Sequence, residues 1–276
     1  MSFLNPKEII SKIIDIGEAK SHLSAKSLLI LGMLAGIYIG FAAHLATTIA
    51  TGECAYFGLK KLLIGAVFSV GLMLVIIPGA ELFTGNNLMT AALYKRKITT
   101  MQMLRNWTWV YVANFIGSII LAFLIARTTG LLSGEVGGTA IRIAYGKVAG
   151  SSADLNHWWA YFTRGILCNW LVCLAVMMAI SATSINGKVW AIFFPIMAFV
   201  AAGFEHSVAN MYFIPAGIFA THFQTAVDAS GLSAEALSNL NWTTMWTQNL
   251  IPVTLGNIVG GGFFTGTVYA YLHREN

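Results

Sequence analysis

The chain carries six long apolar segments, and each is long enough to cross a lipid bilayer as a helix. A membrane-spanning helix needs about 20 consecutive, mostly apolar residues. Of the 276 residues, 57% are hydrophobic and only 10% are charged, whereas soluble domains carry about 25% charged residues. The sequence therefore predicts an all-α integral membrane protein with six spans, at residues 27–50, 62–93, 106–126, 158–180, 189–220 and 252–272.

The second and fifth segments are longer than a simple span requires. Both contain residues that we expect to interrupt a helix: Pro78, Gly79 and Gly85 in the second segment, and Pro195, Gly203 and Pro215 in the fifth. Broken helices at membrane depth are tolerated where the freed backbone is buried in protein or lines a cavity. Both interrupted segments are therefore expected to lie beside a cavity.

Two ionisable residues, Glu205 and His206, lie in the middle of the fifth segment, and Glu81 lies in a similar position in the second. A charged side chain at the centre of a bilayer costs roughly 2.5–3.5 kcal/mol on insertion scales, so such residues are expected at functional sites. We therefore expect the central site at the two interruptions.

Two spacing patterns recur in the same order in the two halves of the chain. Gly-x-Glu-x4-Asn occurs at residues 79–86 and 203–210, and Asn-x3-Val-x3-Asn-x2-Gly occurs at residues 106–117 and 249–260. Each half contains three spans, which is an odd number, so the second half crosses the membrane in the opposite direction. The sequence predicts a three-plus-three inverted repeat, whose interrupted segments point to the permeation site.

The first and fourth spans correspond more weakly, through a Gly-x3-Gly pattern that begins at Gly36 and a Gly-x3-Asn pattern that begins at Gly165. We expect one transmembrane channel domain over residues 1–276, with the two repeats at residues 27–126 and 157–272. The Gly-rich stretch before the second repeat carries no pattern that assigns it a role.

An amphipathic helix is predicted within residues 1–26. Residues 5–8, Asn-Pro-Lys-Glu, match an N-cap, a proline at the first helical position and a capping-box acid. Four isoleucines between residues 9 and 14 form one face. Two interpretations fit this pattern: a helix on the membrane surface, or a helix packed on the protein itself.

The net charge of +5 does not indicate a nucleic-acid partner in a protein of this class. The Lys and Arg residues act instead as topology signals and as attraction for anions. Ten of the 16 fall on the side of the N-terminus and six on the other. This bias predicts that both termini are cytoplasmic.

Four segments resemble signature segments of the formate/nitrite transporter family, at residues 79–86, 168–175, 202–211 and 249–258. The resemblance implies an aquaporin-like fold and a homopentamer with one pore per protomer, in the lipid bilayer of a prokaryotic inner membrane. It also implies passage of small monovalent anions, with formate first and nitrite or hydrosulfide as alternatives. No cofactor and no metal are implied.

By position, the resemblance makes His206 the central pore histidine and Thr84 its partner at the break in the second helix. It assigns apolar constrictions and two vestibule lysines, the inner Lys20 and the outer Lys147. The constriction residues are Phe68, Leu72, Leu82, Phe83, Val172 and Phe199.

Each of these residues also has a purely structural interpretation. His206 is alternatively a core histidine, Thr84 a helix cap, and the apolar residues ordinary helix packing. Glu205 is expected to accept hydrogen bonds from backbone N–H groups freed at a helix break, with Asn169 and Asn257 as further donors.

Two transport mechanisms fit these residues. In the first, a weak acid takes a proton near His206, passes the apolar constrictions as a neutral molecule, and releases the proton on the other side, so that protons move with the anion. In the second, the anion passes directly, with a charged His206 as counter-ion. The sequence leaves both open, because the protonation of a histidine depends on its surroundings.

Two other classes of protein fit less well. A membrane enzyme needs a nucleophile or a metal set, but Glu205-His206 is not His-Glu-x-x-His, and no Gly-x-Ser-x-Gly occurs. An aquaporin-like channel for neutral solutes shares the inverted repeat, but the paired Asn-Pro-Ala turns of that class are absent from the sequence. We therefore expect a non-enzymatic anion channel.

Overall fold

The computed structural model describes residues 3–149 and 157–273. Within these ranges the chain is helical, apart from its connecting loops and an isolated bridge between Phe3 and Ala182. The helices of the first part are α1 (Pro6–Ser21), α2 (Ala25–Ala50), α3 (Phe57–Phe68), α4 (Val70–Ile76), α5 (Phe83–Asn86), α6 (Met89–Tyr94), α7 (Thr100–Arg127) and α8 (Gly134–Val148). Those of the second part are α9 (His157–Ser181), α10 (Ile185–Ala202), α11 (Ser207–Ala220), α12 (Gln224–Ser230), α13 (Ala234–Ser238), α14 (Trp242–Thr244), α15 (Ile251–Asn257) and α16 (Val268–Leu272).

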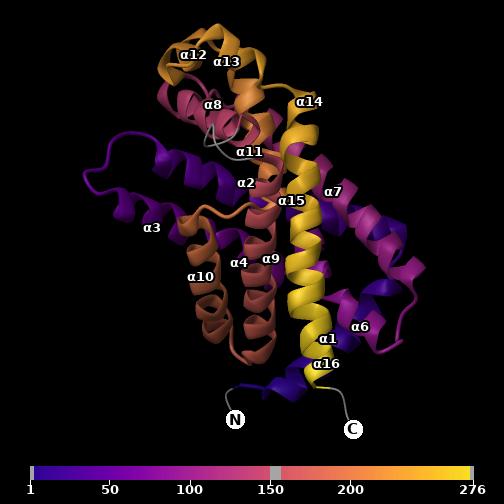
Figure 1. The fold of residues 1–276 in the computed structure, drawn as a ribbon. Helices are drawn as coiled ribbons and strands as arrows, with labels where there is room; N and C mark the ends of the chain where they lie inside the picture. The colour runs from indigo at the N-terminus through magenta and orange to yellow at the C-terminus, as the bar shows by residue number, and fades with distance from the viewer. Residues whose placement is uncertain (1–2, 150–156, 274–276) are drawn as a thin grey trace.

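The expectation of six membrane-spanning segments is confirmed. Six helical stretches are apolar and long enough to span a bilayer: Ala25–Ala50, Phe57–Ile76, Thr100–Arg127, His157–Ser181, Ile185–Ala202 and Trp242–Leu272. In Figure 1, α9 and the last span, from α14 to α16, run along the length of the molecule. Both chain ends lie near α1 and α16 at one end, and α8, α12 and α13 lie at the other.

The second and fifth spans are broken, as the sequence predicts, and each break contains a glycine in the left-handed region. Gly79 has φ +91° between α4 and α5, and Gly203 has φ +81° between α10 and α11. Glycine adopts this conformation without the steric cost that a Cβ imposes. The chain then continues as α5 and α6 in the first repeat and as α11 in the second.

Three residues expected to interrupt helices do not. Gly85 lies within α5, and Pro195 and Pro215 lie inside α10 and α11. Neighbouring helices, side chains and small local adjustments satisfy the backbone groups that a proline frees in a membrane helix. The prediction of an interruption at these three residues was therefore wrong, whereas Gly79 and Gly203 do lie at breaks.

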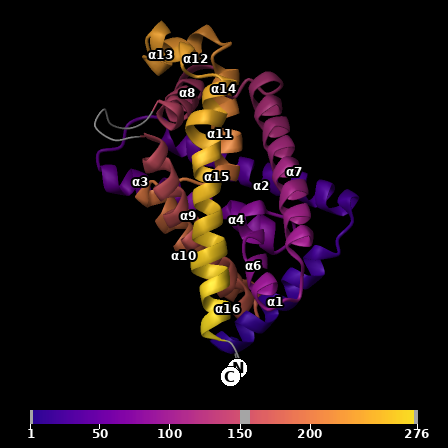
Figure 2. The ribbon, with the colours of Figure 1, turned by 45° about the vertical axis from the view of Figure 1, so that its right-hand side comes forward.

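The last span starts ten residues before the predicted start at Pro252, at Trp242. Its π-helical segments are Met245–Leu250 and Ile258–Thr267. A proline ring clashes with the carbonyl group four residues earlier, which here belongs to Gln248 in the first of these wider segments. The wider turn accommodates Pro252, so the helix continues through this residue instead of beginning there. Figure 2 shows this span running from α14 to α16 along the molecule.

The packing of helices repeats in the two halves. α2 packs along α7, and α9 packs along α15 in the same way. α3 packs against α10 between the two repeats. α1 packs on α6, and α8 packs on α11. α8, for which the sequence indicated no role, therefore takes the place in the second repeat that α1 takes in the first.

The N-terminal helix packs on the protein. Its capping box forms as expected, with Asn5 and Glu8 each bonding the other's backbone N–H at 3.0 and 2.8 Å. Ile10, Ile13 and Ile14 are buried, and the helix contacts α6 and α9. Of the two interpretations, the helix packed on the protein agrees with this burial.

Candidate functional site

An asparagine holds each helix break together. The side chain of Asn114 accepts from the N–H of Phe83 (2.9 Å) and donates to the carbonyl groups of Gly32 (2.7 Å) and Glu81 (2.9 Å). These are backbone groups of the broken helix and of its neighbour α2. A buried backbone group left without a partner is costly, so the amide stabilises the break.

Asn257 makes the equivalent contacts in the second repeat. It accepts from the N–H of Ser207 (2.9 Å) and donates to the carbonyl groups of Gly165 (2.8 Å) and Glu205 (3.0 Å). Gly165 thus corresponds to Gly32. The sequence pairing of Gly165 with Gly36 was displaced by one helical turn, because spaced small residues recur every turn along α2.

A cluster of four polar side chains lies beside each break. In the first repeat, Lys20 donates to Glu81 (2.8 Å) and to Asn86 (2.7 Å). Asn86 donates to Glu81 (2.7 Å) and to Asn106 (2.8 Å). Asn106 donates in turn to the carbonyl oxygen of Lys20 (3.1 Å), which closes the ring of contacts.

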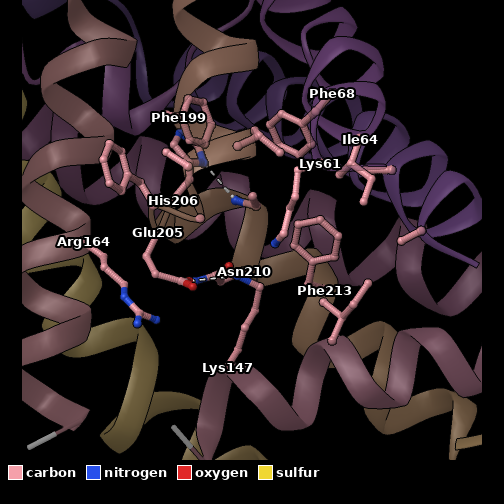
Figure 3. Close-up of a pocket in the computed structure, with 18 of the residues that line it drawn as sticks. Lys61, Ile64, Phe68, Lys147, Arg164, Phe199, Glu205, His206, Asn210 and Phe213 are labelled. Carbon is pink, nitrogen blue, oxygen red and sulfur yellow. Dashed lines mark hydrogen bonds and ion pairs between the residues drawn. The ribbon is translucent and has the colours of Figure 1, made fainter. Parts of the chain in front are cut away.

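The second repeat builds the same cluster from Lys147, Glu205, Asn210 and Asn249. Lys147 donates to Glu205 (2.9 Å), and Asn210 donates to Glu205 (2.6 Å) and Asn249 (2.7 Å). Asn249 donates to the carbonyl oxygen of Lys147 (2.9 Å). The Glu205 carboxylate therefore accepts from side chains, and the expectation that it accepts from backbone N–H groups, Asn169 or Asn257 was wrong. Figure 3 shows Glu205, Asn210 and Lys147 together.

His206 and Thr84 meet at the centre, where the two breaks come together. The Nε2 of His206 lies 2.8 Å from the Oγ1 of Thr84. The Nδ1 of His206 accepts from the N–H of Ala209 (3.1 Å), which caps α11. Because Nδ1 is an acceptor, a neutral ring carries its proton on Nε2 and donates it to Thr84. Both residues are buried, at 3% and 0% exposure.

Asn169 lies next to this pair. Its Nδ2 is 3.1 Å from the carbonyl oxygen of Thr84, 2.8 Å from that of Asn257 and 2.8 Å from the Oδ1 of Asn87. The amide therefore joins α9 to the first break and to α15. Asn169, Thr84 and His206, which the sequence assigned to the centre, do lie together.

Two cavities lie on either side of this centre. The larger, about 710 Å³, contains Lys147, Glu205 and His206 on its wall, and we call it the Lys147 cavity (Figure 3). The smaller, about 250 Å³, contains Lys20 and Glu81 and is called the Lys20 cavity. Both lysines assigned to vestibules therefore line cavities.

Four of the six predicted constriction residues line these cavities at their inner walls. Phe68 and Phe199 line the Lys147 cavity, with ring centroids 5.9 Å apart. Leu72 and Leu82 line the Lys20 cavity. Each of the four is 3% exposed. Phe68 and Phe199 thus line the Lys147 cavity together with His206, and Leu72 and Leu82 line the cavity on the other side.

The other two predicted constriction residues lie elsewhere. The ring of Phe83 packs against Trp107 and Tyr111 of α7, at centroid distances of 6.0 and 4.9 Å. Val172 is buried on α9, one turn before Val176, which lines the Lys20 cavity. Neither is among the residues that line the two cavities.

Several site residues were not identified from the sequence as members of the site. Asn86, Asn106, Asn210 and Asn249 appeared there only as markers of the repeat. The recurrence of these asparagines in both repeats was the sequence signal of their role. A polar residue at the same place in both repeats has equivalent partners in both. Lys61, which also lines the Lys147 cavity, had no such signal.

Comparisons with known proteins agree with this architecture. The sequence profile of the formate/nitrite transporter family matches residues 7–271. A probable formate transporter of Methanothermobacter thermautotrophicus is 41% identical, over 99% of this chain and 98% of that protein. The formate channel FocA of Haemophilus influenzae is also 41% identical, over 89% of this chain and 86% of that protein.

Two solved structures share the fold. One is an FNT family ion channel with a TM-score of 0.82 and 30% identity, over 96% of this chain and 98% of that chain. The other is a pentameric formate channel with formate bound, with a TM-score of 0.78 and 38% identity, over 90% of this chain and 97% of that chain. The chain is therefore a member of the formate/nitrite transporter family.

Proposed function

We propose that this chain forms a membrane channel for formate and similar small monovalent anions. The observation that carries the proposal is the 2.8 Å contact between His206 and Thr84, placed between two cavities and flanked by apolar side chains. Relatives named as formate channels, and a related structure with formate bound, support formate as the substrate. Nitrite and hydrosulfide are the alternatives within this class.

The apolar side chains on the cavity walls make the passage of a charged substrate unfavourable. Phe68 and Phe199 on one side, and Leu72 and Leu82 on the other, offer no polar group to replace the water around an anion. Transfer of a bare ion into such surroundings costs several kcal/mol even after the protein relaxes. A neutral molecule of the same size avoids most of this cost.

Transport of the neutral acid follows from these walls. Formate in the Lys147 cavity takes a proton from water near His206 and becomes formic acid. Formic acid crosses the apolar walls and gives up the proton to water in the Lys20 cavity, so formate and a proton move together. In this scheme the neutral His206 and the Thr84 hydroxyl position the acid by hydrogen bonds.

The surroundings of His206 favour this route over passage beside a charged histidine. Its Nδ1 accepts from the N–H of Ala209, and a proton on Nδ1 would remove that bond and leave a buried N–H without its partner. No carboxylate forms an ion pair with His206 among the residues that the structure describes. A positive His206 would therefore be a buried charge without compensation, which is costly.

The proposal also covers the domain organisation, the assembly and the membrane orientation of the channel. The whole chain acts as one channel domain, and it assembles as a homopentamer like the pentameric formate channel it resembles. The Lys and Arg bias places both termini in the cytoplasm, so the Lys147 cavity faces outward from the inner membrane of a prokaryotic cell.

The direct test is flux through purified protein in proteoliposomes, with formate, nitrite, hydrosulfide, water and glycerol measured side by side. Formate flux well above that of protein-free liposomes is expected, with little water or glycerol flux. Rapid water or glycerol flux without formate flux would identify a neutral-solute channel instead. A larger flux of nitrite or hydrosulfide than of formate would reassign the substrate within the family.

A further inference from the structure

The lysines of the two clusters are paired with carboxylates. Among the described residues that line the Lys20 cavity, Lys20 is the only cation, and its ammonium lies 2.8 Å from Glu81. In the Lys147 cavity, the ammonium of Lys147 lies 2.9 Å from Glu205. Each lysine forms a nearly neutral pair with its glutamate, so neither supplies an uncompensated charge that attracts an anion from a distance.

Lys61 adds a positive charge that this pairing does not cancel. It lies on α3, lines the Lys147 cavity, and its side chain extends into the cavity (Figure 3). Within residues 3–149 and 157–273, no carboxylate forms an ion pair with it. Its ammonium lies over the ring of Phe57, 5.6 Å from the centroid, a contact that leaves the charge in place.

The position of Lys61 relative to the apolar barrier is set by helix geometry. Lys61 and Phe68 are seven residues apart, which is about two turns, so both side chains lie on one face of α3. Ile64 lies between them on this face and also lines the cavity. The Cα atoms of Lys61 and Phe68 are therefore about 10 Å apart along the helix, with the apolar Ile64 between them.

We propose that Lys61 forms an anion-binding subsite in the Lys147 cavity, which captures small monovalent carboxylates before they reach Phe68 and His206. The inference rests on the proposed function, because it names the residue that delivers the anion to the same pathway. An uncompensated cation between low-dielectric walls concentrates anions and raises their rate of capture. The subsite requires only a charge and a cavity, so it binds any small carboxylate weakly and releases it readily.

Among the described residues, none on the wall of the Lys20 cavity is a counterpart of Lys61. α10, which packs against α3 across the repeats, carries Lys188, but its ammonium donates to the carbonyl oxygen of Ala179 (2.7 Å). Lys188 is not among the residues that line the Lys20 cavity. The channel is therefore asymmetric: anions bind more tightly from the Lys147 side than from the Lys20 side.

The neighbouring Lys60 provides a matched control. It carries the same charge and also lines the Lys147 cavity, but its ammonium donates to the carbonyl oxygen of Gly52 (2.6 Å) at an exposed position. A general effect of surface charge would appear equally in Lys60→Gln and Lys61→Gln. A subsite at Lys61 would appear only in the second variant.

The experiment measures initial rates of formate flux from each side of proteoliposomes for wild type, Lys61→Gln and Lys60→Gln, at low and high salt. Cys54 is the exposed cysteine, whereas Cys168 and Cys173 are buried, so labelling with a membrane-impermeant thiol reagent reports how many molecules face each way. Size-exclusion profiles and thermal unfolding of the variants serve as fold controls.

The expected result is a KM for flux from the Lys147 side that rises about three- to tenfold in Lys61→Gln at low salt, with the maximal rate within about twofold of wild type. The increase in KM should be smaller at about 1 M salt, where the Debye length is about 3 Å. KM from the Lys20 side, and both values in Lys60→Gln, should stay within about twofold of wild type.

Three results would overturn the subsite. One is an unchanged KM in Lys61→Gln at low salt, with wild type active. A second is an equal rise in Lys60→Gln, which would indicate a general surface field. The third, no formate flux in wild type, would overturn the proposed function together with the subsite, so the two failures are distinguishable.

Discussion

The ammonium of Lys147 lies 2.9 Å from the carboxylate of Glu205, and in the other repeat Lys20 holds Glu81 at 2.8 Å. The side chains of Glu205 and Glu81 are only 8% and 7% exposed. A buried ion pair of this kind loses far more when one partner is removed than when both are replaced, because a lone charge stays buried.

Lys147→Met should therefore destabilise the protein, by roughly 3–5 kcal/mol if Glu205 stays ionised. The double variant Lys147→Met/Glu205→Gln should recover much of this loss, since it leaves no unpaired charge. Thermal unfolding in a mild detergent measures both, with the exposed Lys12→Met as a control. A double variant no more stable than Lys147→Met would show that the ion pair is not what the cluster depends on.

The asparagine at each break should be as sensitive as the ion pair. Asn257→Ala removes three hydrogen bonds, to Ser207, Gly165 and Glu205, and each buried group left unpaired costs about 1–3 kcal/mol. Asn114→Ala should have a similar effect in the first repeat. Thermal unfolding tests this prediction, and a melting temperature unchanged in both variants would contradict the assigned role of the asparagines.

Helix packing gives a third prediction, from the glycines of the repeated motif. A Cβ at Gly260 would clash with the backbone carbonyl of Ile166, and one at Gly117 would clash with that of Met33. Gly146 lies in helix α8 with open space where its Cβ would be. Gly260→Ala should therefore lower the yield of folded protein, whereas Gly146→Ala should not. Equal yields would mean that α9 and the π-helical segment Ile258–Thr267 can move apart without loss of folded protein.

Much of the fold was predictable from the sequence because the bilayer restricts the choice. Six apolar segments left few alternatives to six helices, and the spacing shared by residues 79–86 and 203–210 located both breaks. Membrane helices tolerate prolines through contacts with neighbouring helices. Pro195 and Pro215 therefore lie inside helices, where the sequence predicts interruptions. Such contacts are not visible in a single sequence.

The site was only partly predictable, for a related reason. His206 was identifiable because an ionisable residue in an apolar segment is costly. Phe83 was not separable from Phe68, since both are aromatic residues in an apolar segment, and only the fold turns Phe83 toward α7. Lys147, which pairs with Glu205, lies on α8, and the sequence of α8 contains no recognisable pattern. The ion pair could therefore not be predicted.

The quaternary structure is open to a simple test. Native mass spectrometry in several mild detergents should show a pentamer, because the pentameric formate channel it resembles shares 38% of its sequence over 90% of this chain. Addition of a stronger detergent should release monomers. A monomer in every mild detergent would contradict the homopentamer and leave the exposed apolar helix faces to lipid alone.

The central claim is that formate and a proton cross the membrane together, as formic acid, past His206. His206→Asn keeps a hydrogen-bonding side chain next to Thr84 but cannot titrate. Wild-type formate flux should rise as the external pH falls, since more substrate is then protonated. The Asn variant should stay folded and keep this pH dependence, because the proton comes from water, but its flux should fall because the shorter side chain no longer holds the acid against Thr84.

The most direct measurement is the pH inside proteoliposomes, recorded together with formate flux at several external pH values. Coupled transport predicts that the lumen of wild-type liposomes acidifies with one proton for each formate taken up, and that His206→Asn lowers the flux but keeps this ratio. Formate flux in wild type without acidification would contradict proton-coupled transport, and an Asn variant with the flux of wild type would contradict the role of His206 in positioning the acid.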